Sequence, residues 1–201
     1  MARISVTESV TLDGVMQGLG RADEDTRGGF DRGGWGDGYQ DEASMRFMGE
    51  GMAEQGVMLF GRRTYDDVLG HWTAVTESNP FTEHLVNATK YVVSRSSHTQ
   101  LAYPNSTLLA GDAVETVGRL KGEVDGAISI IGSGELVRAL HAAGLVDEFT
   151  LQIHPIVLGA GTRLFADGDA ERGAVARADL VLERSVVTST GLIIAQYSVR
   201  R

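Results

Sequence analysis

LFGRRTYDD, residues 59–67, is the stretch where an apolar run gives way to cations and to the start of a helix. The run at 57–60 has the length and composition of a short buried strand, and Gly61 ends it. N–H groups at a helix start lack partners and carry partial positive charge. Arg62 and Arg63 add two cations there, a pattern that favours a bound phosphate. The alternative is a capped helix whose arginines are solvated and pair with nearby carboxylates.

The composition indicates a globular protein and argues against several function classes. The chain has 201 residues, 42% hydrophobic and 22% charged, with net charge -9 and no cysteine. This size supports one domain spanning residues 1–201. The acidity and the scattered cations argue against nucleic-acid binding, and the lack of cysteine rules out disulfides and thiolate metal sites. Without a long apolar segment or a signal-peptide pattern, we expect a cytoplasmic protein with no membrane partner.

Strand and helix patterns alternate over the first two thirds of the chain, which predicts largely parallel strand pairing. The last third has long strands without a long helix between them, which predicts antiparallel strands. The expected strands are 3–12, 57–60, 91–93, 107–110, 127–131, 147–158 and 180–199, the last with a turn at 190–191. The expected helices are 41–54, 64–69 (ending near Gly70), 81–88, 113–120 and 135–143. We therefore predict a mixed α/β domain.

Two further strand ends carry groups suited to phosphate. Residues 94–97, Ser-Arg-Ser-Ser, follow one strand and suit the extra phosphate of NADP, although a polar turn is the alternative. Residues 131–136, Ile-Gly-Ser-Gly-Glu-Leu, join another strand to a helix and partly match a dinucleotide fingerprint. Val137 stands where a third glycine is expected, and the alternative is a tight turn with positive φ. Because ligands collect at the carboxyl ends of parallel strands, we expect the three strand ends to meet.

These segments resemble the dihydrofolate reductase-like superfamily, in particular the branch similar to the C-terminal reductase domain of the bifunctional riboflavin-biosynthesis enzyme. The motifs that carry the resemblance are TLDG at 11–14, LFGRRTYDDV at 59–68, VVSRS at 92–96, IIGSGELVRAL at 130–140, GLVDEFTLQIHPIVLGAG at 144–161 and LF at 164–165. The resemblance implies a three-layer α/β fold with a mixed central sheet and antiparallel C-terminal strands. It also implies an NADPH-dependent reductase that transfers a hydride to a small heterocycle, either a pyrimidine of riboflavin biosynthesis or a pterin.

The resemblance also implies where NADPH binds. The two helix starts would hold the cofactor phosphates, the serine-arginine turn would read the adenosine 2′-phosphate, and the residues after TLDG would lie near the nicotinamide. The implied cofactor residues are Val15, Met16, Gly61, Arg62, Arg63, Thr64, Ser94, Arg95, Ser96, Gly132, Ser133, Gly134, Glu135 and Leu136.

The implied catalytic residues are Asp41, Trp35 and Asp13. In dihydrofolate reductases an acid follows a tryptophan at a helix start, which favours Asp41; burial against Trp35 would raise its pKa. The alternatives are a helix N-cap at Asp41 and a turn residue at Asp13. The five histidines have no metal-ligand spacing, so no metal is expected, and His154 reads as a satisfied core histidine.

The glycine-rich segment 18–38 is interpreted as a lid that closes over the nicotinamide, with a disordered linker as the alternative. A small-molecule substrate and a homodimer are expected. Two other functions stay open at this point. One is a non-catalytic NADP(H)-binding or ligand-sensing protein, which keeps the phosphate groups and loses the chemistry. The other is a scaffold, which binds no cofactor.

Overall fold

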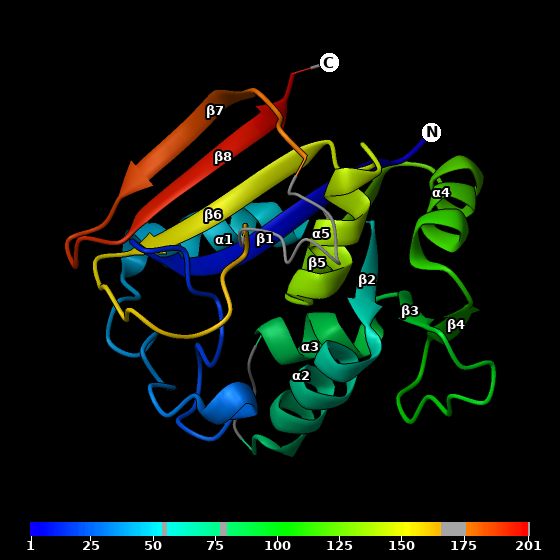
Figure 1. The fold of residues 1–201 in the computed structure, drawn as a ribbon, viewed down its shortest axis with the longest axis horizontal. Coiled ribbons are helices and arrows are strands. Elements are labelled where there is room, and N and C mark those ends of the chain that lie inside the picture. The colour runs from blue at the N-terminus through cyan, green and yellow to red at the C-terminus, as the bar shows by residue number, and fades with distance from the viewer. Residues whose placement is uncertain (54–55, 77–79, 166–175, 201) are drawn as a thin grey trace. The chain divides into compact units, whose positions relative to one another are not determined.

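The computed structural model describes residues 1–53, 56–76, 80–165 and 176–200. The chain divides into two compact units, the first made of Met1–Val6 with Met52–Val146 and the second of Thr7–Gly51 with Asp147–Arg201. Strand β1 (Arg3–Thr11) begins in the first unit and ends in the second (Figure 1). The strand order is β4-β3-β2-β5-β1-β6-β8-β7.

The first unit alternates strands and helices, as the sequence predicts. Its strands are β2 (Val57–Gly61), β3 (Lys90–Ser94), β4 (Ser106–Ala110) and β5 (Ala127–Ile131), and the neighbours β4-β3, β3-β2 and β2-β5 all pair in parallel. Its helices are α2 (Arg62–Ala74), α3 (Pro80–Asn87), α4 (Ala113–Glu123) and α5 (Gly134–Ala142). A buried cluster that includes Phe60, Tyr65 and Leu69 forms part of its core.

The second unit contains the antiparallel strands. They are β6 (Glu148–His154), β7 (Leu180–Val187) and β8 (Ile193–Val199), and β8 pairs with both of the others. Helix α1 (Glu42–Ala53) lies mostly in this unit, as does the short 3-10 helix η1 (Arg27–Gly29). The mixed sheet and the antiparallel C-terminal strands are therefore confirmed.

The largest errors in the predicted boundaries concern helix α2 and strand β6. Helix α2 starts at Arg62 and continues through Gly70 to Ala74, because Tyr65 and Leu69 bury one of its faces and packing outweighs the low helix propensity of glycine. Strand β6 ends at His154 rather than at residue 158, since the proline that follows has no N–H to donate to a strand neighbour. The prediction of a single domain stays a prediction. Within the described residues, no helix is long and apolar enough to cross a membrane.

Candidate functional site

The ends of β2 and β5 are held together through one hydroxyl group. We call residues 61–64 and 132–134 the turn pair. Oγ of Ser133 accepts a hydrogen bond from the N–H of Gly61 at 2.9 Å and donates one to Oγ1 of Thr64 at 2.7 Å. Strands β2 and β5 are parallel neighbours, so both turns lie at the same edge of the sheet. The structure thus brings together two of the three strand ends that the sequence singles out.

Two glycines of the turn pair are required by packing, and Gly132 also has the positive φ of the tight turn that was the alternative for residues 131–136. A Cβ added to Gly61 would lie 2.6 Å from Oγ of Ser133, and one added to Gly132 would lie 2.8 Å from Cγ2 of Thr64. Gly132 also has φ +70°, which favours glycine. The missing side chains therefore let one turn pack against the other.

Both helices that start at the turn pair begin without a side-chain cap. The N-cap residues are Gly61 for α2 and Ser133 for α5, and neither makes a capping bond from its side chain. Thr64 does not cap α2 either; its hydroxyl accepts the bond from Ser133. Two such helix starts at neighbouring strand ends fit an anionic group, because their first-turn N–H groups point outward and carry partial positive charge.

The arginines of this edge are exposed. Arg62 pairs with Asp66 at 3.0 Å one helical turn away, whereas Arg63 and Arg95 are surface residues. The turn that contains Arg95 follows β3, the other parallel neighbour of β2. In that turn the Oγ of Ser94 lies 2.7 Å from Oγ1 of Thr99. All three predicted strand ends therefore lie along one edge of the parallel sheet in the first unit.

Asp41 is the N-cap of α1, the alternative that the sequence left open. Its Oδ1 accepts the N–H of Ser44 at 2.9 Å, while Oγ of Ser44 accepts the N–H of Asp41 at 2.8 Å. Its Oδ2 accepts both the N–H and the hydroxyl of Ser189, at 2.8 and 2.9 Å. These bonds, led by the one from Ser44, lower the pKa of Asp41 to about 2. The raised pKa that was expected is therefore wrong, since hydrogen bonds to the carboxylate outweigh burial.

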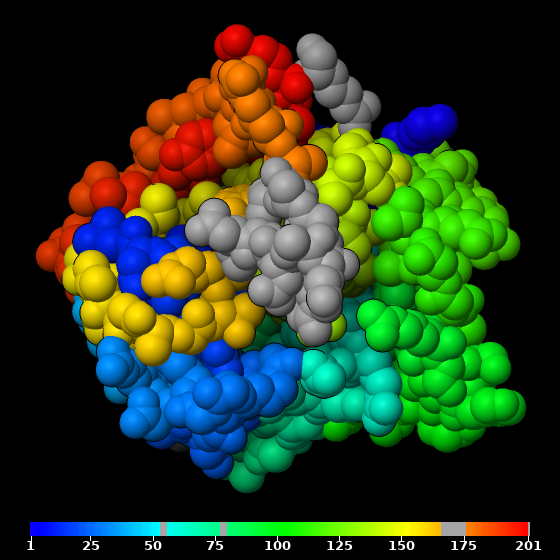
Figure 2. All heavy atoms as spheres, viewed as in Figure 1, coloured from blue at the N-terminus to red at the C-terminus, as the bar shows by residue number. Residues whose placement is uncertain are grey.

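Asp13 also uses its carboxylate for structure. It accepts a bond from the hydroxyl of Thr11 at 2.6 Å and from the N–H groups of Leu158 and Gly159 at 3.1 and 2.8 Å. The Thr11 bond is the largest cause that lowers the pKa of Asp13 to about 2. Figure 2 shows the amber segment around residue 158 beside the dark blue residues that follow β1. The proton-donor roles of Asp13 and Asp41 stay predictions, and both low pKa values speak against them.

The segment 17–38 is folded against the loop that follows β6. Gln17 is buried, and its Nε2 donates to the carbonyls of Asp25 and Arg27, each at 3.0 Å. Its Oε1 accepts the N–H of Thr162 at 2.9 Å, and its carbonyl accepts Nε1 of Trp35 at 2.7 Å. Gln17 therefore holds three parts of this segment and the loop at Thr162 together through hydrogen bonds. The sequence did not predict this role. Closure as a lid stays a prediction.

The residues expected near the nicotinamide belong to the second unit. Val15 is fully buried and packs with Phe30, Trp35 and Leu158. The backbone of Met16 pairs with Thr162 through a bond of 2.9 Å. The side chain of Val15 is therefore used for packing, and its backbone N–H and C=O are both hydrogen-bonded to Thr11.

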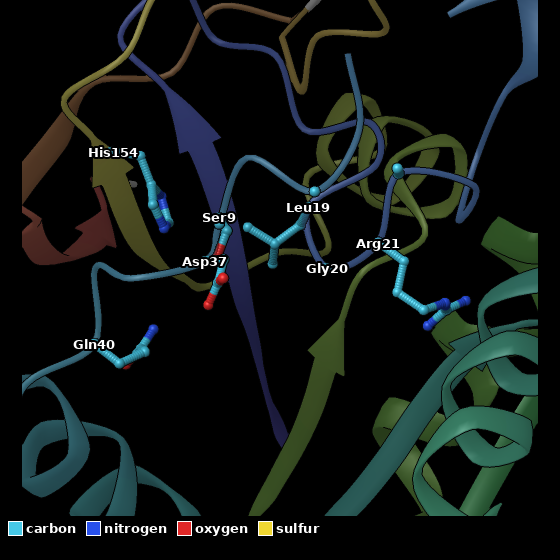
Figure 3. A pocket seen from close by; sticks show the side chains of 10 residues that line it. Ser9, Leu19, Gly20, Arg21, Asp37, Gln40 and His154 are labelled. Carbon is cyan, nitrogen blue, oxygen red and sulfur yellow. The ribbon is translucent and has the colours of Figure 1, made fainter. Parts of the chain in front are cut away.

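A pocket of about 380 Å³ opens in the second unit (Figure 3). It is lined by residues of β1, of β6 and of the segment after β1. These include Ser9, Leu19, Arg21, Asp37, Gln40 and His154. Figure 3 shows the imidazole of His154 pointing from β6 toward the space between Ser9 and Gln40. Sequence reasoning did not assign this pocket, because its walls come from segments more than a hundred residues apart.

His154 is not the satisfied core histidine that was expected. It is 1% exposed, and its Nε2 has no hydrogen-bond partner in the part of the chain that the structure describes. Burial lowers the pKa of His154, against the opposing effect of the carbonyls of Gln152 and Val10. The signal in the sequence is the alternation of β6, which places two polar residues, Gln152 and His154, on one buried face. Among the described residues, no group of three or more His, Asp or Glu side chains is arranged to hold a metal ion.

Comparisons with known proteins place this geometry in a family. The chain is 38% identical over 116 residues to the uncharacterized protein YyaP of Bacillus subtilis (strain 168), a match that covers 55% of this chain and 59% of that relative's length. The fold is similar to a pyrimidine reductase-like protein from Corynebacterium diphtheriae NCTC, with TM-score 0.67, 13% identity and coverage of 100% of this chain and 92% of the other.

It is also similar to the dihydrofolate reductase of Enterococcus faecalis complexed with NADP(H) and RAB-propyl, with TM-score 0.61, 13% identity and coverage of 99% and 97%. These two likenesses show the dihydrofolate reductase-like fold. The model of the RibD C-terminal domain matches residues 2–194. The chain therefore belongs to the RibD C-terminal domain family, a reductase-type family, and has the dihydrofolate reductase-like fold.

Proposed function

We propose that the protein is an NADPH-dependent reductase that transfers a hydride to a small heterocyclic substrate, a pyrimidine of the riboflavin route or a pterin. The observation that carries the proposal is the turn pair, where two uncapped helix starts stand at neighbouring ends of parallel strands. Membership of a reductase-type family supports it. NADPH would supply the hydride, and the chain would bind its phosphates, orient it and exclude water.

The residues at this edge have the chemistry that NADPH phosphates require. First-turn N–H groups of α2 and α5 suit the pyrophosphate, and Arg62 and Arg63 add positive charge beside them. Ser94 and Arg95, at the end of the neighbouring strand β3, suit the 2′-phosphate that distinguishes NADPH from NADH. The acidity of the whole chain does not oppose this, because charges beyond about 10 Å are largely screened at physiological salt.

The test is a titration of the protein with NADPH and with NADH, followed by cofactor fluorescence. We expect NADPH to bind more tightly, and the double variant Arg62→Ala with Arg95→Ala to weaken NADPH binding about tenfold to a hundredfold while changing NADH binding less. The matched control is Arg46→Ala, which also removes an exposed arginine paired with a carboxylate one turn away, in α1. If neither nucleotide binds, the proposal fails.

A second candidate is a non-catalytic NADP(H)-binding or ligand-sensing protein. The observation that favours it is that the two predicted acids, Asp13 and Asp41, are both held ionised by hydrogen bonds. This candidate predicts the same nucleotide binding but no oxidation of NADPH with any pterin or aminopyrimidine. A panel of such substrates, followed by the loss of NADPH absorbance, separates the two functions, because steady turnover with one substrate is enough to reject the sensor.

The homodimer stays a prediction, and β7 is where we expect it to form. This strand is last in the strand order and exposes apolar side chains. They are Leu180, Val181, Leu182 and Val187, exposed by 37%, 36%, 53% and 68%. Exposed edge strands pair readily with another chain. Sedimentation of the wild type and of Leu182→Lys tests this, since a dimer built on this strand would dissociate in the variant.

A further inference from the structure

His154 holds a buried nitrogen lone pair in a fixed place. Its Nδ1 lies 3.2 Å from the carbonyl oxygen of Gln152, and the tautomer that makes this hydrogen bond carries its hydrogen on Nδ1. In the neutral ring Nε2 is then an acceptor, and it has no partner among the described residues. Leaving such a group buried without a partner is unfavourable. A ligand that donates a hydrogen bond to Nε2 would remove that penalty.

The ring is also held rigidly. Trp35 and Tyr39 pack edge-on against it, with ring centroids 5.0 and 5.2 Å from that of His154 and interplanar angles of 87° in both pairs. Nε1 of Trp35 is fixed in turn by the carbonyl of Gln17. An acceptor that is already oriented loses little entropy when a ligand binds, which favours a binding role.

A second acceptor lies on the same face of β6. Oε1 of Gln152 is buried and, like Nε2 of His154, has no hydrogen-bond partner within the described ranges. Residues two apart in a strand point to the same side. This face of the strand therefore carries a second buried acceptor without a partner, although Gln152 does not line the pocket itself.

The remaining walls of the pocket narrow the ligand class. Leu19 supplies an apolar surface, and Ser9 and Gln40 can both donate and accept hydrogen bonds. Arg21 and Asp37 have opposite charges, so the lining favours neither an anion nor a cation. We propose that this pocket is a ligand site in which Nε2 of His154 accepts a hydrogen bond from a ring N–H of a neutral, planar heterocycle. Such a ligand has an N–H group for Nε2 of His154 and carbonyls for the side chains of Ser9 and Gln40.

This inference deepens the proposed function, on which it rests for the choice of a heterocycle. It assigns recognition of the substrate to His154 and not to Asp41, whose carboxylate is taken up by Ser44 and Ser189. His154 is thereby a positioning and specificity-determining residue. Removing its acceptor should weaken ligand binding and leave nucleotide binding unchanged.

The first experiment compares two probes that differ only in their N–H groups. Lumazine is a fluorescent fused pyrimidinedione with ring N–H donors, and its doubly N-methylated derivative has none. We expect wild-type protein without nucleotide to bind lumazine at least about tenfold more tightly than the methylated compound. A difference of this size in affinity corresponds to the loss of one buried hydrogen bond. Equal affinity for both compounds, or binding of neither, would overturn the inference.

Two variants test whether lumazine binding depends on the side chain of His154. His154→Phe keeps a planar ring between Trp35 and Tyr39 but has no acceptor, so we expect its affinity for lumazine to fall about tenfold. His154→Gln keeps an acceptor and should recover part of the affinity. Lumazine binding that is unchanged in His154→Phe would show that the ligand lies elsewhere.

A measurement on unmodified protein covers the case in which both variants misfold. In protein labelled with nitrogen-15 histidine, we expect the Nε2 resonance of His154 to be that of a lone-pair nitrogen and to move upfield on addition of lumazine. An Nε2 that already carries hydrogen in the free protein contradicts the proposal. Failure of NADPH binding with intact lumazine binding would reject the proposed function alone, whereas the reverse result would reject only this inference.

Discussion

Lys90 and His154 are both buried bases, one in each unit, and they differ in how their nitrogen atoms are satisfied. Lys90 is 0% exposed and His154 is 1% exposed. Nζ of Lys90 donates to the carbonyls of Leu85, Val86 and Ala88 at 2.8, 3.0 and 2.7 Å. Nε2 of His154 has no partner within the residues described.

The difference teaches that burial of a base does not by itself mark a binding site. The ammonium of Lys90 closes the C-terminal end of α3, where the last helical carbonyls lack partners in the helix itself. Its role is complete without a ligand. The imidazole of His154 lines a pocket, and its Nε2 has no hydrogen-bond partner among the described residues. We therefore assign it a role in ligand binding. Four substitutions test this distinction, and they are ordered by the expected effect on the free energy of unfolding.

The largest effect is expected for Lys90→Met. The change removes the donor of one buried and two partly buried hydrogen bonds to carbonyls, and we expect a loss of about 3 kcal/mol in the free energy of unfolding. Urea denaturation measures it. The control is Arg119→Met, which removes an exposed cation from α4 and should change the free energy by less than about 0.5 kcal/mol. Equal effects of the two changes would break the comparison.

Asp13→Asn tests a satisfied carboxylate. The pKa of Asp13 is about 2 in the folded protein against 3.8 in the unfolded chain, so its contribution is present above about pH 4 and is lost as the pH falls from 3.8 through 2. Because this carboxylate is partly exposed, screening leaves about 1–2 kcal/mol. We expect Asp13→Asn to lower stability at pH 7 by that amount and to flatten the acid side of the stability curve. Thermal unfolding between pH 2 and 7 checks both expectations.

Ser133→Ala removes the hydroxyl that joins the two turns of the turn pair. One donor and one acceptor lose their partner, and we expect a loss of about 1 kcal/mol in the free energy of unfolding. Ser96→Ala, at an exposed turn position, is the control and should be neutral. A neutral Ser133→Ala would mean that water replaces the serine, and that the turn pair is held by its glycines.

The smallest effect is expected for His154→Phe. The change removes the bond from Nδ1 to Gln152, which destabilises, and it also removes the unpartnered Nε2, which stabilises. We expect these terms to cancel to within about 1 kcal/mol. Urea denaturation in parallel with Lys90→Met makes the comparison direct. A loss as large as that of Lys90→Met would mean that His154 is as well satisfied as Lys90.

Much of the fold could be predicted from the sequence because the signals are local. The strands of the first unit are short apolar runs ended by glycine or serine, and its helices have a buried face with helical spacing. The two largest boundary errors, at Gly70 and at 155–158, occur where packing or proline changes a local pattern. The phosphate-type strand ends could be found for the same reason, since each lies within one short segment.

The pocket and the state of its side chains could not be predicted in this way. Asp41 follows a tryptophan, and the sequence allows both an acid and a helix cap there. The hydrogen bonds from Ser44 and from the distant Ser189 identify it as the cap. His154 reads as a core residue, and only the absence of a partner for Nε2 in the described structure shows otherwise.

The sequence by itself thus determined the α/β class, the order of most elements and three strand ends suited to phosphate. Only the tertiary structure decided which polar groups are satisfied. Local patterns depend on neighbours a few residues away, whereas the state of a buried polar atom depends on every segment that packs around it. For His154 these segments are β1 and the loop that carries Trp35 and Tyr39, which lie more than a hundred residues from it along the chain.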